Sequence, residues 1–336
     1  MRGADESRRA MVPYGRTVMT ARALRALVFV LCAGGAVVAI AGYAHRALAS
    51  ASVTIASGSN ATRTTIPVTI DGLRASCVLD TGTSAMIVSP WLAQAARLSS
   101  RAGSFEVAPD GHTYVDRQTS IPRFGVGGYT LHDLAALISP NLTGYNALCG
   151  YDFFMRFPTL IDRDRRLVTL FPPSWRLARM HCLPVDLSPH VPLATIEINE
   201  TWVRYIVLDS GMAGGGALWE GVRPQLRRPL VANAEYETMP AAVRDGFACG
   251  ALASVRYAAG APESSMPLCT EPQRPDGYNG IIETNLSTVH AMAVDYPHRR
   301  ICFDVSGYAQ VATPGYPSYS ARDAWSRFNY LRPPRN

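Results

Sequence analysis

The chain repeats one series of sequence elements after about 130 residues, and this repeat limits what it can fold into more than any other feature. In the first copy, residues 65–70 alternate apolar and polar side chains, Asp71-Gly72 follows, and an apolar return segment ends at Asp80. In the second copy, residues 193–198 alternate in the same way, and the return segment after a two-residue turn ends at Asp209. Alternation with period two is typical of half-buried strands, and turns of two residues join antiparallel strands. Each copy therefore begins with a predicted β-hairpin.

The similarity continues beyond these hairpins. Residues 148–154 place a glycine before a short apolar helix, and a predicted hairpin at 160–170 follows; the second copy has Gly280 before Ile-Ile-Glu and a predicted hairpin at 293–303. Three matched pairs have nearly the same separation: 129 residues for Asp80 and Asp209, 130 for Gly150 and Gly280, and 133 for Arg166 and Arg299. We therefore predict a mostly β protein with two similar lobes, residues 52–175 and 190–310, a proline-rich connector, and a Pro- and Arg-rich tail at 313–336.

An apolar segment precedes the first copy. Residues 26–44 carry no charged side chain and follow an arginine-rich segment, residues 1–25. A helix of 19 residues reaches nearly across a hydrocarbon layer of ~30 Å. Because Ala47-Leu48-Ala49 is also a cleavage pattern, residues 26–49 are predicted to be either a membrane anchor or a cleaved signal peptide. In both cases the chain after them is expected outside the cytoplasm, periplasmic or secreted.

Composition excludes several classes of protein. Hydrophobic residues make up 48% and charged residues 17% of the 336 positions, which is too apolar for a disordered chain. The mean hydropathy of +0.03 is too low for a protein with many membrane spans. All 32 basic residues are arginines, and they are scattered rather than clustered, so we expect no nucleic-acid partner. The histidines and cysteines form no zinc motif, so no metal is expected.

Both apolar return segments end in an aspartate, a hydroxyl residue and a glycine. These are Asp80-Thr81-Gly82, continued by Thr83-Ser84, and Asp209-Ser210-Gly211. The hydroxyl can bond across to the opposite turn, and glycine allows the two turns to approach closely. Two carboxyl groups that meet in this way cannot both ionise and share one proton. The ionised partner can then activate water as a general base, while the protonated partner polarises a carbonyl group.

The segment Val78–Ser84 resembles the active-site motif of the aspartic peptidases, the pepsin and retropepsin group. Leu148-Cys149-Gly150 is similar to the second signature of that fold, and residues 150–154 resemble bacterial retropepsin-like proteins. The resemblance covers about 250 residues and implies two pepsin/retropepsin-like β-barrel lobes with a cleft between them. It also implies catalytic Asp80 and Asp209, supported by the neighbouring residues Thr81, Gly82, Thr83, Ser84, Ser210 and Gly211.

The same resemblance implies how the cleft is used. Residues 107–114 would form the flap that closes over a substrate, with Asp110-Gly111 at its tip and Tyr114 on its returning strand; an ordinary surface hairpin is the alternative. The family hydrolyses peptide bonds without a cofactor, so the expected partner is a peptide or protein substrate. Residues 26–44 would add a membrane contact if they are not cleaved. We expect a monomer, because one chain supplies both aspartates.

The second copy departs from the family pattern. Met212 stands where the first copy has Thr83, Gly214-Gly215-Gly216 follows instead of an apolar strand, and Tyr278-Asn279 precedes Gly280 in place of two aliphatic residues. These departures leave open a non-catalytic peptide-binding protein on the same scaffold. A nucleotide-binding glycine loop at 211–216 is a further alternative, but the βαβ unit that it needs is missing. A separation of about 3 Å between the two carboxyl groups would favour the catalytic pair.

Two further expectations concern the cysteines and the titration of the pair. Six cysteines lie outside the apolar segment and allow 15 pairings. We predict Cys249–Cys269 within the second lobe, and Cys77–Cys149 because the segments before the aspartate and the signature glycine adjoin in the aspartic-peptidase fold. Since Thr83 can donate a hydrogen bond to Asp80, we expect Asp80 to be the ionised partner and Asp209 to carry the proton.

Overall fold

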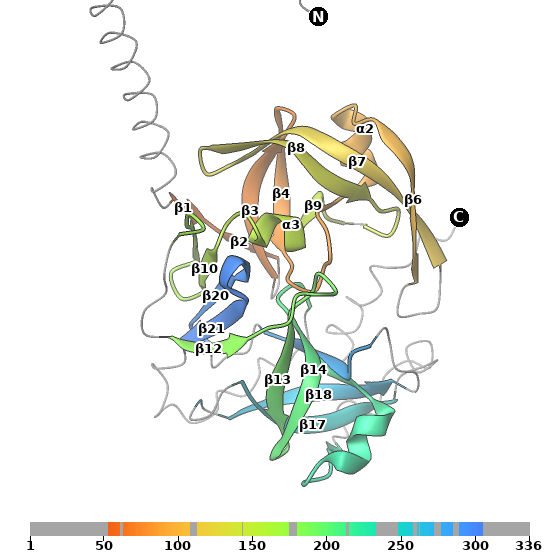
Figure 1. Ribbon diagram of the computed structural model, residues 1–336, viewed down its shortest axis with the longest axis vertical. Helices are drawn as coiled ribbons and strands as arrows, with labels where there is room; N and C mark the ends of the chain where they lie inside the picture. Colours follow the sequence, from red (N-terminus) through yellow and green to blue (C-terminus); the bar gives the residue numbers. More distant parts are fainter. Residues whose placement is uncertain are drawn as a thin grey trace, which may run out of the picture. The chain divides into compact units, whose positions relative to one another are not determined.

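The computed structural model describes residues 53–60, 63–107, 113–142, 144–174, 180–212, 215–232, 248–257, 261, 263–271, 277–284 and 289–304 (Figure 1). Contacts divide the chain into two units, residues 1–50 and 51–336, and every described residue belongs to the second. The apolar segment 26–44, its cleavage pattern and the tail 313–336 lie outside the described residues. Within the described part of the chain, no helix is long and apolar enough to cross a membrane.

The first copy of the repeat forms an eight-stranded sheet in the order β2-β3-β4-β9-β5-β8-β7-β6. An additional pairing between β3 and β7 joins strands far apart in that order and closes the sheet into a barrel. Its strands are β2 (Gly58–Asn60), β3 (Arg63–Ile70), β4 (Leu73–Leu79), β5 (Ile87–Val88), β6 (Ser100–Val107), β7 (Thr113–Val126), β8 (Tyr129–Ile138) and β9 (Ala147–Cys149).

Local chemistry explains the β3–β4 hairpin. Ile66, Val68 and Ile70 alternate into the core, as the sequence pattern predicts. Asp71 and Gly72 both have positive φ angles, 49° and 88°, which is the backbone of a two-residue hairpin turn. The hairpin therefore positions the end of β4, and Asp80 after it, at a fixed edge of the barrel.

Two short helices belong to this lobe. Helix α2 (Pro90–Ala95) begins with proline, and the side chain of Ser89 caps it by accepting a hydrogen bond from the main-chain N–H of Leu92. Helix α3 (Tyr151–Phe154) follows Gly150 directly and buries Phe153 and Phe154. The predicted short apolar helix after the glycine is therefore present.

The second copy forms a seven-stranded sheet in the order β13-β14-β19-β15-β18-β17-β16, closed by a β13–β17 pairing. One expectation was wrong: an apolar strand, β15 (Gly216–Trp219), begins at the last of the three glycines and corresponds to β5. Helix η1 (Glu220–Gln225) comes directly after it. The strands are β13 (Leu193–Ile198), β14 (Thr201–Asp209), β15 (Gly216–Trp219), β16 (Val231–Ala232), β17 (Ala248–Arg256), β18 (Ser264–Glu271) and β19 (Gly280–Glu283).

A third sheet takes strands from both copies. Its six strands are β1 (Val53–Ala56), β11 (Leu167–Leu170), β10 (Thr159–Asp162), β20 (Ala291–Asp295), β21 (Arg300–Asp304) and β12 (His181–Pro184), in that order. The central pairing, β10 with β20, places Ile161 opposite Met292. The two predicted hairpins at 160–170 and 293–303 are thus parts of one sheet that joins the lobes (Figure 1).

Two disulfides can be assigned to both of their cysteines within the described residues. Cys77–Cys149 links β4 to β9 with a Cα–Cα distance of 5.8 Å, so this predicted pairing is confirmed. Cys182–Cys302 links β12 to β21 and was not predicted. Cys269 is also disulfide-bonded, and Cys249 is its partner in the β17–β18 register. The predicted Cys249–Cys269 pairing fits this register and stays a prediction.

Candidate active site

The two Asp-hydroxyl-Gly turns interlock through four hydrogen bonds. The main-chain N–H of Thr81 donates to Oγ of Ser210 at 3.1 Å, and that of Ser210 donates to Oγ1 of Thr81 at 2.9 Å. The Thr81 hydroxyl donates to the carbonyl of Leu208 at 2.7 Å, and the Ser210 hydroxyl donates to the carbonyl of Leu79 at 2.8 Å. Each hydroxyl therefore reaches across to the opposite lobe, as expected from the two turns, and the bonds are related by the symmetry of the repeat.

Each glycine of these turns lies against the aspartate of the other lobe. A Cβ atom added to Gly82 would be 2.5 Å from Cγ of Asp209, and one added to Gly211 would collide with the carboxyl group of Asp80. Real Cβ atoms do not approach so closely, so no other residue fits either position without displacing a carboxyl group.

The carboxyl groups of Asp80 and Asp209 lie within hydrogen-bonding reach of each other. Desolvation by burial raises the pKa of both groups. For Asp80 the Thr83 side chain and the charge of Arg63 partly offset this rise in pKa. For Asp209 the negative charge of Asp80 adds to it and holds the pKa well above the ordinary value. These pKa shifts favour Asp80 as the ionised partner, because the pKa of Asp209 is raised further.

Asp209 also receives two main-chain hydrogen bonds. The N–H groups of Gly211 and Met212 donate to its Oδ1 at 2.7 and 3.0 Å. The side chain of Met212 is buried and offers no donor, as the sequence indicates, but the main chain at that position does. The turn therefore holds the Asp209 carboxyl group rigidly without a second hydroxyl.

The signature glycine of the first lobe has a clear role. Gly150 lies next to the Asp80 turn, where Tyr151 donates its N–H to the carbonyl of Thr83 at 3.0 Å. A Cβ on Gly150 would be 2.5 Å from that same carbonyl oxygen. Only glycine therefore lets β9 pass this close to the turn.

The counterpart of Gly150 in the second lobe is Glu283, and the match of Gly150 with Gly280 was wrong. In the first lobe Leu79 pairs with Cys149, whereas in the second Leu208 pairs with Ile282 and Asp209 with Glu283. The matching position is thus 133 residues away, as for Arg166 and Arg299, rather than 130.

Glu283 occupies this position by bonding to the glycine-rich loop. Its Oε2 accepts a hydrogen bond from the N–H of Gly215 at 2.8 Å, and its own N–H donates to the carbonyl of Gly215 at 3.0 Å. Glu283 is only 2% exposed. Sequence reasoning missed this buried carboxyl group, because the wrong glycine had been matched.

The predicted flap is a hairpin of β6 and β7, with Val107 opposite Thr113. The predicted tip, Asp110 and Gly111, lies outside the described residues. The backbone of Tyr114 pairs with Glu106 on the returning strand. Ser84 is exposed at the outer end of the first turn. The hairpin is therefore present where the flap was expected, and its contacts with a substrate stay a prediction.

Two residues near the pair were not predicted. Arg63 on β3 lowers the pKa of both aspartates by its charge and donates a hydrogen bond to the Tyr145 hydroxyl at 2.8 Å. Tyr296, in the short helix η2 (Tyr296–His298), is buried and donates its hydroxyl proton to the carbonyl of Thr81 at 3.2 Å. Neither position belongs to a motif, so no sequence pattern pointed to them.

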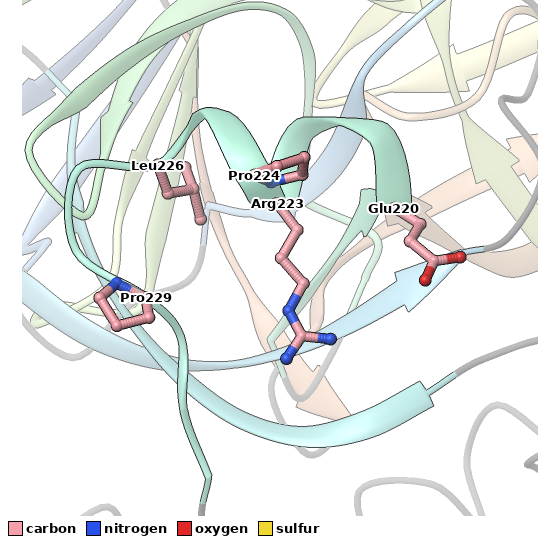
Figure 2. Close-up of a pocket in the computed structure, with 5 residues that line it drawn as sticks. All are labelled: Glu220, Arg223, Pro224, Leu226 and Pro229. Atoms are coloured by element: carbon pink, nitrogen blue, oxygen red, sulfur yellow. The ribbon is translucent and has the colours of Figure 1, made fainter.

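A separate hollow of about 480 Å³ lies beside η1 in the second lobe, and no residue of the aspartate turns lines it. Figure 2 shows the five side chains around it, Glu220, Arg223, Pro224, Leu226 and Pro229. Four of these side chains are exposed. In the described segments, no group of three or more His, Cys, Asp and Glu side chains could hold a metal ion.

The interlocked turns and a family comparison both support an aspartic peptidase of the retropepsin type. Residues 66–156 match the family model described as "gag-polyprotein putative aspartyl protease". The match spans most of the first lobe, including Asp80 and Gly150, and confirms the resemblance drawn from the Val78–Ser84 motif. No curated protein matches the chain.

Proposed function

We propose that this protein is an aspartic endopeptidase that hydrolyses peptide bonds with a water molecule activated between Asp80 and Asp209. The observation that carries the proposal is the mutual effect of the two carboxyl groups on each other's pKa, together with the glycine of the other lobe that faces each of them. Like charges this close share one proton, which is the chemical requirement of the reaction.

Each partner has a defined role in the proposed reaction. Ionised Asp80 takes a proton from water as the water oxygen attacks the peptide carbonyl carbon, and Asp209 gives its proton to the carbonyl oxygen. The product of this step is a neutral tetrahedral diol. Asp80 then protonates the leaving nitrogen, Asp209 takes a proton from one hydroxyl, and the C–N bond breaks. The pair returns to its starting protonation state.

The site of action and the assembly state belong to the same proposal. We propose that the chain works as a monomer, since both turns come from one chain. The disulfides Cys77–Cys149 and Cys182–Cys302 support an oxidising compartment outside the cytoplasm, in agreement with residues 26–49 as an anchor or signal peptide.

A second candidate is a non-catalytic peptide-binding protein on the same scaffold. Two observations in the second lobe favour it: the apolar side chain at Met212, and Glu283 in place of the signature glycine. Both candidates use the same cleft and flap, so only a measurement of hydrolysis separates them.

The test is hydrolysis of a peptide library by the full chain, read by mass spectrometry. We expect cleavage at acid to mildly acid pH, and a loss of at least about 10³-fold in kcat/KM in both Asp80→Asn and Asp209→Asn, since each removes half of one catalytic unit. The matched control is Asp71→Asn, the same substitution at an exposed turn where asparagine fits equally well.

The outcomes separate the candidates. Peptide binding without hydrolysis would support the non-catalytic protein. Full activity in Asp209→Asn would mean that the second turn is dispensable and that two chains each contribute Asp80.

A further inference from the structure

Tyr296 connects the second copy of the repeat to the Asp80 turn. Its side chain is 1% exposed and packs against Phe154 and Tyr151 of α3, with ring centroids 5.4 and 6.0 Å away. Its hydroxyl donates a hydrogen bond to the carbonyl oxygen of Thr81 at 3.2 Å. A residue 215 positions away in the sequence thus fixes one carbonyl group of the catalytic turn.

That carbonyl belongs to the peptide group that serves Asp80. In a planar trans peptide the N–H points away from the C=O, so the direction of the Thr81 carbonyl sets the direction of the Gly82 N–H. The Gly82 N–H lowers the pKa of Asp80 and so favours its ionised form. One peptide group therefore accepts a hydrogen bond from Tyr296 on one side, and on the other side its N–H lowers the pKa of Asp80.

We propose that Tyr296 is a positioning residue for Asp80, which acts through the Thr81–Gly82 peptide group to orient and polarise the Gly82 N–H. The inference rests on the proposed function. A hydrogen bond to a carbonyl oxygen makes the N–H of the same peptide a better donor, because bonds in a chain polarise one another. A better donor stabilises ionised Asp80 and supports its role as the base.

The groups around Tyr296 keep its hydroxyl a donor. Burial, the charges of Asp80 and Asp209, and the neighbouring Tyr151 hold the pKa of Tyr296 well above its ordinary value. The preceding residue Asp295, at the end of β20, is bonded to His298 at 2.7 Å and to Arg300 at 2.8 Å. Across the site, the charge of Arg63 acts on both aspartates, and His190 stacks on Tyr151.

The contact also distinguishes the two aspartates. The hairpin loops 163–166 and 296–299 occupy matching places in the repeat, and the first copy has Arg163 where the second has Tyr296. The repeat therefore supplies this tyrosine only once, and the Thr81 carbonyl of the first turn receives its hydrogen bond. The asymmetry agrees with Asp80, rather than Asp209, as the ionised partner.

The test is the pKa of Asp80 in the full chain, read from carboxyl ¹³C shifts during a pH titration and assigned with Asp80→Asn. In Tyr296→Phe we expect the pKa of Asp80 to rise by about 0.3 pH units, since cooperative polarisation changes a bond by roughly 10–30%. The acid limb of the pH profile of kcat should move to higher pH by the same amount, and KM should stay unchanged. An unchanged pKa of Asp80 in folded Tyr296→Phe would overturn the proposal.

Two further variants complete the test. Tyr257→Phe is the matched control. The buried Tyr257 hydroxyl also donates to a main-chain carbonyl, that of Glu283, at 2.6 Å. The N–H of the same peptide group, from Thr284, bonds to the main-chain carbonyl of Asp209 and not to a carboxyl group. An equal shift of the Asp80 pKa in this control would also overturn the proposal.

A second variant covers the case in which Tyr296→Phe does not fold. The hydroxyl of 3-fluorotyrosine is a stronger hydrogen-bond donor, so this residue at position 296 should lower the pKa of Asp80. Because the ¹³C titration does not depend on hydrolysis, a wild-type chain without activity would sink the proposed function and leave this inference standing.

Discussion

The two aspartates end equivalent strands, yet their carboxyl groups have different neighbours. Asp80 faces the hydroxyl of Thr83, whereas Asp209 is held by the main-chain N–H groups of Gly211 and Met212 and carries the extra repulsion of Asp80. The net pKa of Asp80 is still raised, because burial outweighs the hydrogen bonds. The sequence predicts the order of the two pKa values through Thr83, but burial cannot be read from a motif.

Removing the Thr83 hydroxyl should move the acid side of the pH profile. In Thr83→Ala the ionised form of Asp80 loses a donor, so its pKa rises further and the acid limb of kcat/KM moves to higher pH. In Met212→Thr a new hydroxyl beside Asp209 should lower the upper apparent pKa and move the alkaline limb inward. The measurement is a pH–rate profile of both variants. An acid limb that stays in place in Thr83→Ala and shifts in Met212→Thr would reverse the two roles.

The buried carboxyl of Asp209 should also cost stability at neutral pH. Its pKa is raised above 3.8 on folding, so the protonated form contributes stability that is present below that pH and lost as the pH rises through the folded-state value. Asparagine keeps the acceptor for Gly211 and Met212 and cannot ionise. Asp209→Asn should therefore melt above the wild type at pH 7, by about 2–4 °C for each kcal/mol regained. Melting curves should converge near pH 3, and a difference that grows on acidification would contradict the assignment.

At the scale of strands and turns, periodicity predicts most of what positions the site. The hairpins that lead to Asp80 and Asp209 form as expected, because alternation and two-residue turns are local signals. The counterpart of Gly150 in the second copy was assigned wrongly, because a glycine, Gly280, lies three residues before the true position, Glu283. Only the pairing of Asp209 with Glu283 in the parallel strands decides between them, and that pairing is not a local property.

Glu283 should act as a hydrogen-bond acceptor for the loop that follows Asp209. In Glu283→Ala the buried N–H of Gly215 loses its partner, which should cost about 1–3 kcal/mol of unfolding free energy. Glu283→Gln keeps an oxygen acceptor and should retain most of the stability and activity. Urea unfolding measures the difference. A glutamine variant as unstable as the alanine variant would show that the charge, rather than the acceptor, is what the loop needs.

At the scale of the whole molecule, the sheet that joins the lobes was beyond sequence reasoning. The repeat suggests two independent lobes, because each hairpin can be assigned within its own copy. The structure instead pairs β10 with β20, and Cys182–Cys302 ties the connector strand β12 to this sheet. Contacts between residues more than 100 positions apart leave no periodic signal. Tyr296 was missed for the same reason, since its partner Thr81 lies in the other copy.

The two disulfides should differ in their effect on activity. They close loops of 72 and 120 residues, and the chain-entropy relation gives about 4 and 5 kcal/mol, respectively, for their contribution. We expect Cys77→Ala/Cys149→Ala and Cys182→Ala/Cys302→Ala to lose comparable stability in urea. Only the first pair lies close to the catalytic turn, with Cys77 three residues before Asp80 and Cys149 directly before Gly150, so only its removal should lower kcat in the folded chain. Equal losses of kcat would contradict this difference.

The central claim is that the two turns of one chain form a single catalytic pair. A peptide with a secondary hydroxyl in place of the scissile carbonyl imitates the tetrahedral diol and should bind between the two carboxyl groups. Calorimetric titration counts these sites. The account predicts one analogue bound per chain, with binding lost or greatly weakened in both Asp80→Asn and Asp209→Asn. One analogue for every two chains, or unchanged binding in Asp209→Asn, would contradict it.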